Sequence, residues 1–131
     1  MKPLYLLLFI FLTSCINTTE TAIVKPANES FENFNTRFHT DSLFQLSRIK
    51  FPIGGQFVDG FERHEWTIEN WDLHKEPVSG KKLKGFEHTI TKTDTTVVEK
   101  IWIENSGFNF ERKFKIIEGQ WFLTYCKDLN L

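Results

Sequence analysis

The sequence predicts an α+β domain in which N-terminal helices pack on one face of a curved antiparallel sheet, after a lipoprotein signal peptide. Near the start of the domain, apolar residues recur at helical spacing in two short stretches. Towards the end, four stretches alternate between polar and apolar residues, as half-buried strands do. Because no helical pattern separates these four stretches, we expect them to form an antiparallel meander over residues 86–92, 95–103, 108–117 and 120–128.

Residues 1–14 have the composition of a bacterial lipoprotein signal peptide. Lys2 supplies the positive start, and the apolar run at 3–12 is shorter than the ~20 residues that span a bilayer. Leu12-Thr13-Ser14-Cys15 then matches a lipobox, so we expect cleavage before Cys15 and lipidation of its thiol. Several acyl chains on one residue anchor a protein effectively permanently. The alternative is an ordinary secretory leader with a chance cysteine.

Residues 15–29 predict a flexible tether between the lipid and the domain. They are mostly polar and show no apolar periodicity, so they have little to bury. A flexible linker of this length holds the domain roughly 20 Å from the membrane. The remaining residues, 30–131, have the usual size of a single domain.

Composition excludes several classes of partner. The net charge is −1, and without a basic excess we expect no nucleic acid. The four histidines lack metal-ligand spacing and no Gly-rich phosphate loop follows a strand, so we expect neither metal nor cofactor. With Cys15 lipidated, Cys126 should be a free, shielded thiol; a catalytic nucleophile or an intermolecular disulfide are the alternatives. The 14 Phe and 4 Trp indicate a large apolar interior or an aromatic-walled pocket.

Both helices are predicted from caps and apolar spacing. Ser30 is a plausible N-cap, followed by Phe31, Phe34 and Phe38 on one helical face. A second cap at Thr40 or Asp41 begins a short helix with Leu43, Phe44 and Leu46 as its apolar side.

The middle of the domain is less regular. Residues 47–53 alternate as a strand does, and Gly54-Gly55 turns the chain towards a further strand near 61–68. Residues 70–85 contain Pro77, two glycines and Trp71, which predicts a loop at the rim of a pocket or over it.

One face of the predicted meander is apolar except for four residues, one per strand: His88, Glu99, Arg112 and Tyr125. Two-residue turns at 93–94 and 118–119 would place His88 opposite Glu99 and Arg112 opposite Tyr125. In the middle hairpin, the register that avoids opposed lysines places Glu99 opposite Arg112. The sequence therefore predicts one polar row across an otherwise buried face.

Three interpretations of this row stay open, since buried charges are costly unless they are paired or line a wet cavity. The row is a structural polar network, or it is the polar floor of a ligand pocket in which Arg112 binds a carboxylate or phosphate and Tyr125 donates. In the third interpretation, Glu99 orients His88 as a general acid or base.

Trp102 and Phe122 are expected on the opposite, polar face of the sheet. They pack under a loop or form a dimer patch.

The spacing Phe31-x-x-Phe34-x-x-x-Phe38-x-x-Asp41-Ser42-x-Phe44-Gln45-x-Ser47-Arg48-Ile49-x-Phe51-Pro52 resembles the opening of an uncharacterised lipoprotein family of gut anaerobes, domain of unknown function 4348. The resemblance covers about residues 30–131. It implies a cystatin-like, nuclear transport factor 2-like (NTF2-like) fold whose curved sheet wraps helices around a conical pocket, and it brings no established activity. Surface-exported lipoproteins of such bacteria often carry an acidic run after the cysteine. Residues 16–19 lack one, which favours the periplasmic side of the outer membrane.

These observations lead to three hypotheses of function. The first is a lipid-anchored cell-envelope protein whose pocket binds a small ligand without turning it over. The second is a protein-interaction or dimerisation module that uses the outer sheet face, giving a homodimer. The third is a small isomerase or hydrolase that uses His88 and Glu99.

Overall fold

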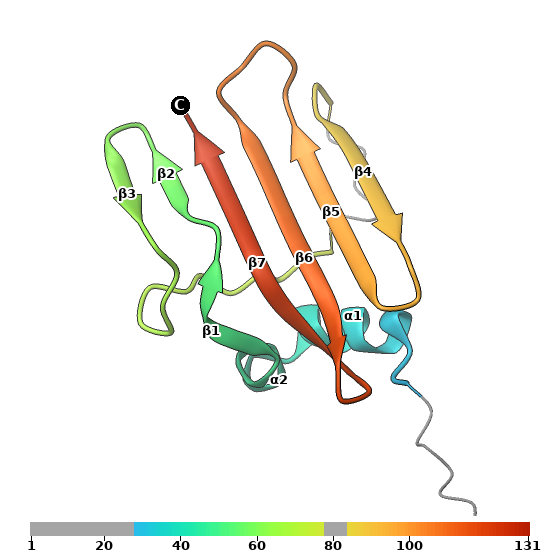
Figure 1. Cartoon of the computed structure of the whole chain (residues 1–131). Helices are drawn as coiled ribbons and strands as arrows, with labels where there is room; N and C mark the ends of the chain where they lie inside the picture. Colours follow the sequence, from blue (N-terminus) through green and yellow to red (C-terminus); the bar gives the residue numbers. More distant parts are fainter. Residues whose placement is uncertain (1–27, 78–83) are drawn as a thin grey trace, which may run out of the picture.

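The computed structural model describes residues 28–77 and 84–131. The predicted signal peptide, Cys15 and most of the predicted tether lie outside these residues. The described chain forms a seven-stranded sheet with two short helices on one face (Figure 1). Within this part of the chain, no helix is both long and apolar enough to cross a membrane.

The elements follow in the order α1 (Phe31–Thr40), α2 (Ser42–Ser47), β1 (Ile49–Gly54), β2 (Phe57–Asp59), β3 (Glu62–His64), β4 (Glu87–Lys92), β5 (Thr96–Trp102), β6 (Asn109–Ile117) and β7 (Gln120–Asn130). The strand order in the sheet is β3-β2-β7-β6-β5-β4, and β1 also pairs with β7. The domain is therefore α+β, and its last four strands form the predicted meander.

Both helices begin at the predicted caps. The Ser30 side chain accepts a hydrogen bond from Asn33 N, and the Asp41 carboxylate accepts one from Phe44 N at 2.9 Å. These contacts satisfy backbone donors that have no partner inside the helix. Phe34 and Phe38 are buried against Phe114 of β6, with ring centroids 5.6 and 5.5 Å apart, so α1 covers the centre of the sheet.

The sheet is not purely antiparallel, contrary to the sequence prediction. β1 and β2 both run parallel to β7, with Ile49 opposite Leu123 and Val58 opposite Leu129. The chain leaves α2 at the end of the sheet where β7 begins, so a strand that follows directly must run in the same direction as β7 (Figure 1). The strand expected near 61–68 is shorter, and β3 pairs with β2 as a small hairpin.

The predicted register of the first hairpin is wrong. The predicted two-residue turn at 93–94 is a longer connection, in which Thr93 N donates to Thr96 O and Thr96 N to Thr93 Oγ1. Lys92 therefore pairs with Val97, which moves Ile90 opposite Glu99 and leaves His88 opposite Ile101. The Thr93 side chain stabilises a wider turn than composition alone suggests.

The middle hairpin has the predicted register, and the last hairpin has it only in part. Glu99 pairs with Arg112. In the last hairpin Phe114 pairs with Leu123 as expected, but Lys113 pairs with Tyr125, so Thr124 is an extra residue in β7. Because a bulge changes the face on which later side chains lie, Tyr125 turns to the outer face and Cys126 takes its place opposite Arg112.

The interior is filled with aromatic side chains. Trp71, expected at a pocket rim, is instead 8% exposed and packs against Trp66 with ring centroids 5.2 Å apart. Cys126 is the free, buried thiol that the sequence predicts, and burial raises its pKa to about 12. The buried core comprises Phe31, Phe34, Phe38, Phe44, Ile49, Ile53, Trp66, Trp71, Val97, Phe114, Trp121, Leu123 and Cys126.

Candidate functional site

Four polar side chains from four parts of the chain meet inside this aromatic core, and we call them the Arg112 centre. Glu99 comes from β5 and Arg112 from β6, and the cross-strand pairing places them side by side. His39 comes from the last turn of α1, and His74 from the loop that follows β3.

The ion pair at the heart of the centre is almost fully buried. The side chains of Glu99 and Arg112 are each 1% exposed. Arg112 donates from Nε and from Nη2 to the same carboxylate oxygen, Glu99 Oε2, at 2.9 and 2.6 Å. Charged groups so far from water persist only when paired and hydrogen-bonded, and this geometry supplies both conditions.

The remaining terminal nitrogen of Arg112 faces the two histidines. Arg112 Nη1 lies 3.2 Å from His39 Nε2 and 3.0 Å from His74 Nδ1. Because a guanidinium only donates, both ring nitrogens act as acceptors, which requires neutral imidazoles. His39 Nδ1 carries the proton of its ring, since it lies 2.7 Å from the carbonyl oxygen of Asn35.

Burial and the guanidinium both oppose protonation of these histidines. Burial lowers the pKa of His39 to about 4, with a further contribution from the charge of Arg112. Burial also lowers the pKa of His74 well below its ordinary value, together with the charges of Arg112 and His39. The centre therefore carries one positive and one negative charge at neutral pH, flanked by two neutral rings.

One side chain, Gln45 of α2, holds His74 in place. Gln45 Nε2 donates to Phe38 O at 2.6 Å and to His74 O at 2.7 Å. Gln45 Oε1 accepts from Trp71 Nε1 at 3.1 Å and from His74 N at 2.9 Å. All four hydrogen-bonding positions of this buried amide are used, so the 71–74 loop is attached to the junction of the two helices.

Glu99 Oε1 is the unsatisfied atom of the centre. It is buried and has no hydrogen-bond partner among the described residues. An unsatisfied carboxylate oxygen away from water is costly, which indicates that another donor belongs beside it. Among the described residues, no group of three or more His, Cys, Asp or Glu side chains is placed to hold a metal ion.

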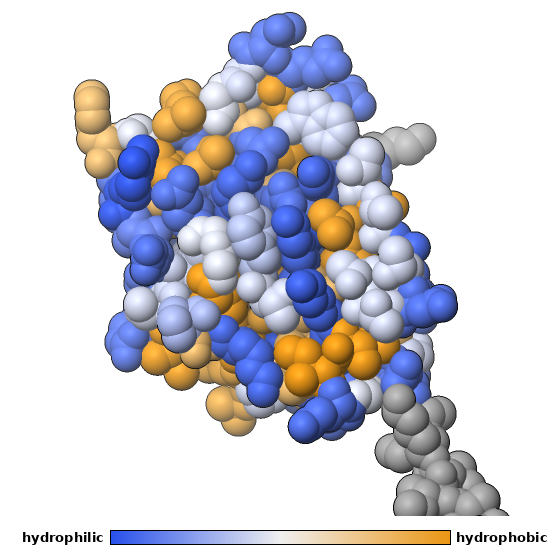
Figure 2. Space-filling view, viewed as in Figure 1, coloured by the Kyte–Doolittle hydropathy of each residue, from blue (hydrophilic) through white to orange (hydrophobic). Residues whose placement is uncertain are grey.

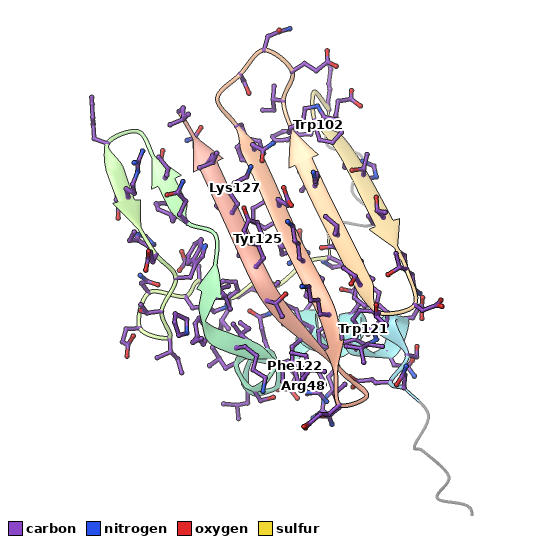
Figure 3. The ribbon with its side chains drawn as sticks, viewed as in Figure 1. Arg48, Trp102, Trp121, Phe122, Tyr125 and Lys127 are labelled. Atoms are coloured by element: carbon purple, nitrogen blue, oxygen red, sulfur yellow. The ribbon has the colours of Figure 1, made fainter. Side chains whose placement is uncertain are left out.

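Of the four residues in the predicted row, the structure brings only Glu99 and Arg112 together. His88 is exposed on the edge strand β4, where it faces Ile101 and not Glu99. Tyr125 lies on the outer face because of the Thr124 bulge, as Figure 3 shows. The acid–base pair of His88 and Glu99 is therefore not formed.

Sequence reasoning missed the two histidines that complete the centre. His39 follows Phe38 on the buried side of α1, and its helical position was the available signal. His74 lies in an irregular loop, where no periodicity indicates which side chains point inward.

Trp102 and Phe122 do not form one patch. Both lie on the outer face, but near opposite ends of the sheet, as Figure 3 shows. Phe122 is close to two cations, with Lys50 Nζ 4.4 Å from its ring centre and Arg48 Cζ 5.5 Å from it.

A surface hollow of about 590 Å³ lies at the base of the domain, away from the Arg112 centre. Its walls include Glu29 and Glu32, whose carboxylates already pair with Arg48 and Lys92. The hollow thus differs from the conical pocket that the family resemblance implies, which would lie over the polar row.

The comparisons with known proteins agree with the fold. The model of one protein family matches residues 29–129 of this chain. No curated protein matches the chain.

The similar solved structures include the following three. A cystatin-like protein from Bacteroides caccae is 20% identical with a TM-score of 0.59, over 79% of this chain and 78% of that one. A protein from Bacteroides uniformis is 24% identical with a TM-score of 0.56, over 79% and 77%. An NTF2-like protein from Bacteroides fragilis is 21% identical with a TM-score of 0.51, over 79% of this chain and 48% of that chain. At these identities the likeness shows the fold alone.

The lowered histidine pKa values predict that the domain loses stability in mild acid. Unfolded histidine titrates near pH 6.5 and folded His39 near 4, so between these values the unfolded chain binds more protons. The contribution of neutral His39 to the free energy of unfolding is complete above about pH 6.5 and declines as the pH falls towards 4, by up to about 1.4 kcal/mol per pH unit. The lowered pKa of His74 acts in the same direction. Urea unfolding at pH 7.5, 6.0 and 5.0 measures it. The variant His39→Gln should flatten the dependence, whereas His88→Gln, at an exposed position, should not.

Removing one partner of the buried ion pair should lower the free energy of unfolding much more than removing both. Arg112→Met strands the Glu99 carboxylate, and we expect a loss of about 3–5 kcal/mol in the free energy of unfolding. The double variant Glu99→Gln/Arg112→Met removes both charges and should recover most of that loss. Denaturant unfolding of the two single variants and the double variant gives the coupling energy. Additive losses would contradict the pairing.

Proposed function

Because the chain belongs to the family whose model matches residues 29–129 and has the cystatin-like or NTF2-like fold, we propose that it is a lipid-anchored cell-envelope protein that binds a small ligand at the Arg112 centre without turning it over. Folds of this kind often form ligand-binding pockets. The observation that carries the proposal is the unpartnered oxygen Glu99 Oε1, buried among polar groups where such a pocket would lie.

The charge of the centre favours a neutral ligand with a hydroxyl group. Arg112 is already neutralised by Glu99, so a carboxylate or phosphate ligand would meet the Glu99 carboxylate as well. Glu99 Oε1 requires a donor, and the hydrogen bonds to Glu99 and to the two histidines use four of the five N–H groups of Arg112. A hydroxyl group both donates and accepts, and therefore matches this pair of groups.

Binding without turnover is supported by the state of the ionisable groups. Both inner histidines accept hydrogen bonds from Arg112, and their lowered pKa values keep them neutral over the physiological range. An acid–base catalyst needs a pKa near the working pH. His88 lies exposed on the edge strand, where it faces Ile101 and not Glu99.

Access to the centre requires the loop that carries His74 to move. Arg112 and Glu99 are covered from the helix side by His39 and His74. The loop is attached through Gln45 and through the hydrogen bond from Arg112 to His74, and these contacts hold the cover closed.

The anchoring part of the proposal rests on the lipobox and on a polar segment between Cys15 and the domain. A domain attached in this way works beside a membrane, and the absence of acidic residues at 16–19 favours the periplasmic face of the outer membrane.

Anchoring is tested by metabolic labelling. Cells that express the chain should incorporate radiolabelled palmitate into it, and Cys15→Ala should abolish the label because the thiol is the acylated group. The matched control is Cys126→Ala, which should label normally. Equal labelling of the Cys15→Ala variant would rule out the lipid anchor.

Ligand binding is tested by native mass spectrometry of the full chain extracted in detergent. We expect the wild-type protein to carry a small-molecule adduct that the charge-balanced double variant Glu99→Gln/Arg112→Met lacks. His88→Gln should keep the adduct, since that side chain is exposed. A wild-type protein without an adduct, or an adduct of equal occupancy in the double variant, would refute a ligand at this centre.

A further inference from the structure

The outer face of the sheet carries a concentration of positive charge that the proposed ligand site does not use. We call it the lysine face: Lys50 of β1, Lys100 of β5, Lys113 and Lys115 of β6, and Lys127 of β7. The register places Lys100 and Lys127 in one cross-strand row on either side of Glu111. Across β1 and β4 to β7 the outer face has these five lysines against two glutamates, Glu111 and Glu87, a net charge of +3, although the whole chain has a net charge of −1.

Glu111 does not neutralise this surface. Its carboxylate lies 3.1 Å from Lys113 Nζ and 3.6 Å from Lys100 Nζ. Burial by itself would raise the pKa of Glu111, but the hydrogen bond from Lys113 and the charges of Lys113, Lys100 and Lys127 outweigh it, so the pKa is lowered. One carboxylate is thus shared among several ammonium groups, and the excess positive charge faces solvent.

Aromatic side chains lie between these lysines. Lys113 Nζ is 4.5 Å from the centre of the Tyr125 ring, and Lys50 Nζ is 4.4 Å from that of Phe122. Tyr125, Phe122 and Lys127 all project from the face towards the viewer in Figure 3. Figure 2 shows the same face as a hydrophilic band with apolar side chains at its margins.

The start of the domain is fixed beside the lysine face. Glu29 N donates to Gly119 O at 2.8 Å, and Trp121 Nε1 donates to Glu29 O at 2.9 Å. Gly119 belongs to the turn between β6 and β7, a few residues from the pair formed by Lys115 and Phe122. The chain therefore begins its fold at the end of the sheet where the lysine face begins (Figure 1).

From this placement we infer that the lysine face lies on an anionic lipid surface and sets the orientation of the domain on its membrane. The inference rests on the proposed lipid anchor. A flexible tether with an r.m.s. span of roughly 20 Å also lets the base of the sheet reach the bilayer. The headgroups then lie beside these lysines, and basic side chains are attracted to such a surface over about one Debye length. Lysine provides flexible point charges, which suit a surface of many phosphates better than one shaped anion.

The inference is tested with the lipidated full chain reconstituted in two kinds of vesicle, phosphatidylcholine alone and phosphatidylcholine with phosphatidylglycerol. An amine-reactive acylating reagent and mass spectrometry report the labelling of each lysine. Lys100, Lys115 and Lys127 should label several-fold more slowly on the anionic vesicles than on the neutral ones. The protection should vanish at high salt. Lys75, an exposed loop residue, should label equally on both.

Matched variants control for a general charge effect. Lys115→Gln/Lys127→Gln leaves the contacts of Glu111 with Lys100 and Lys113 intact and should remove the protection of Lys100. Lys75→Gln/Lys84→Gln changes the net charge equally, at exposed loop positions, and should leave it in place.

The outcomes separate this inference from the proposed anchor. If the chain fails to float with either kind of vesicle, the anchor is wrong and the inference falls with it. If it floats with both but the lysines label equally, the anchor stands and the inference is overturned. A third outcome is that anionic vesicles give no protection of the lysines, whereas polyglutamate, a soluble polyanion, added to neutral vesicles does. That result would overturn the inference in favour of an acidic macromolecular partner.

Discussion

The buried ion pair between Glu99 and Arg112 is the constraint on which the rest of the structure depends. Both charges lie under an aromatic core, and neither can remain there without its partner. The pairing requires β5 and β6 to adopt one register, and the two free N–H groups of Arg112 Nη1 require acceptors from the helix side. The sheet, α1 and the 71–74 loop are thereby held to one another through a single guanidinium.

Much of the fold follows from local rules that act within a few residues. Ser30 and Asp41 begin the helices because their side chains bond the first backbone donors, and alternation identifies β5, β6 and β7. The register of the middle hairpin was predictable because the other choice opposes Lys100 to Lys113, and charge decides between the two.

The predictions failed where a single residue changes which side chains of a strand face the core. They also failed where the residue that holds a side chain in place is distant in sequence. One extra residue, Thr124, moves Tyr125 to the outer face and Cys126 inward, and alternation on either side of it looks equally regular. Thr93 widens the first turn by its own hydrogen bonds. His74 reaches Arg112 only because Gln45 fixes its loop, a contact between residues 29 positions apart that no local pattern contains. Half of the polar row was thus predictable, and the other half was misplaced by the turn at Thr93 and the bulge at Thr124. Only His74, which lies outside the row, depended on a long-range contact.

The way Gln45 is bonded has a consequence for how the interior opens. A loop held by separate contacts frays from one end, residue by residue. Here one amide bonds Trp71, the N–H and the carbonyl of His74, and the end of α1, so rotation of that side chain releases every one of them together. Exchange of the His74 amide with solvent is therefore coupled to release of the Trp71 indole and of the end of α1, because the same side chain bonds all three.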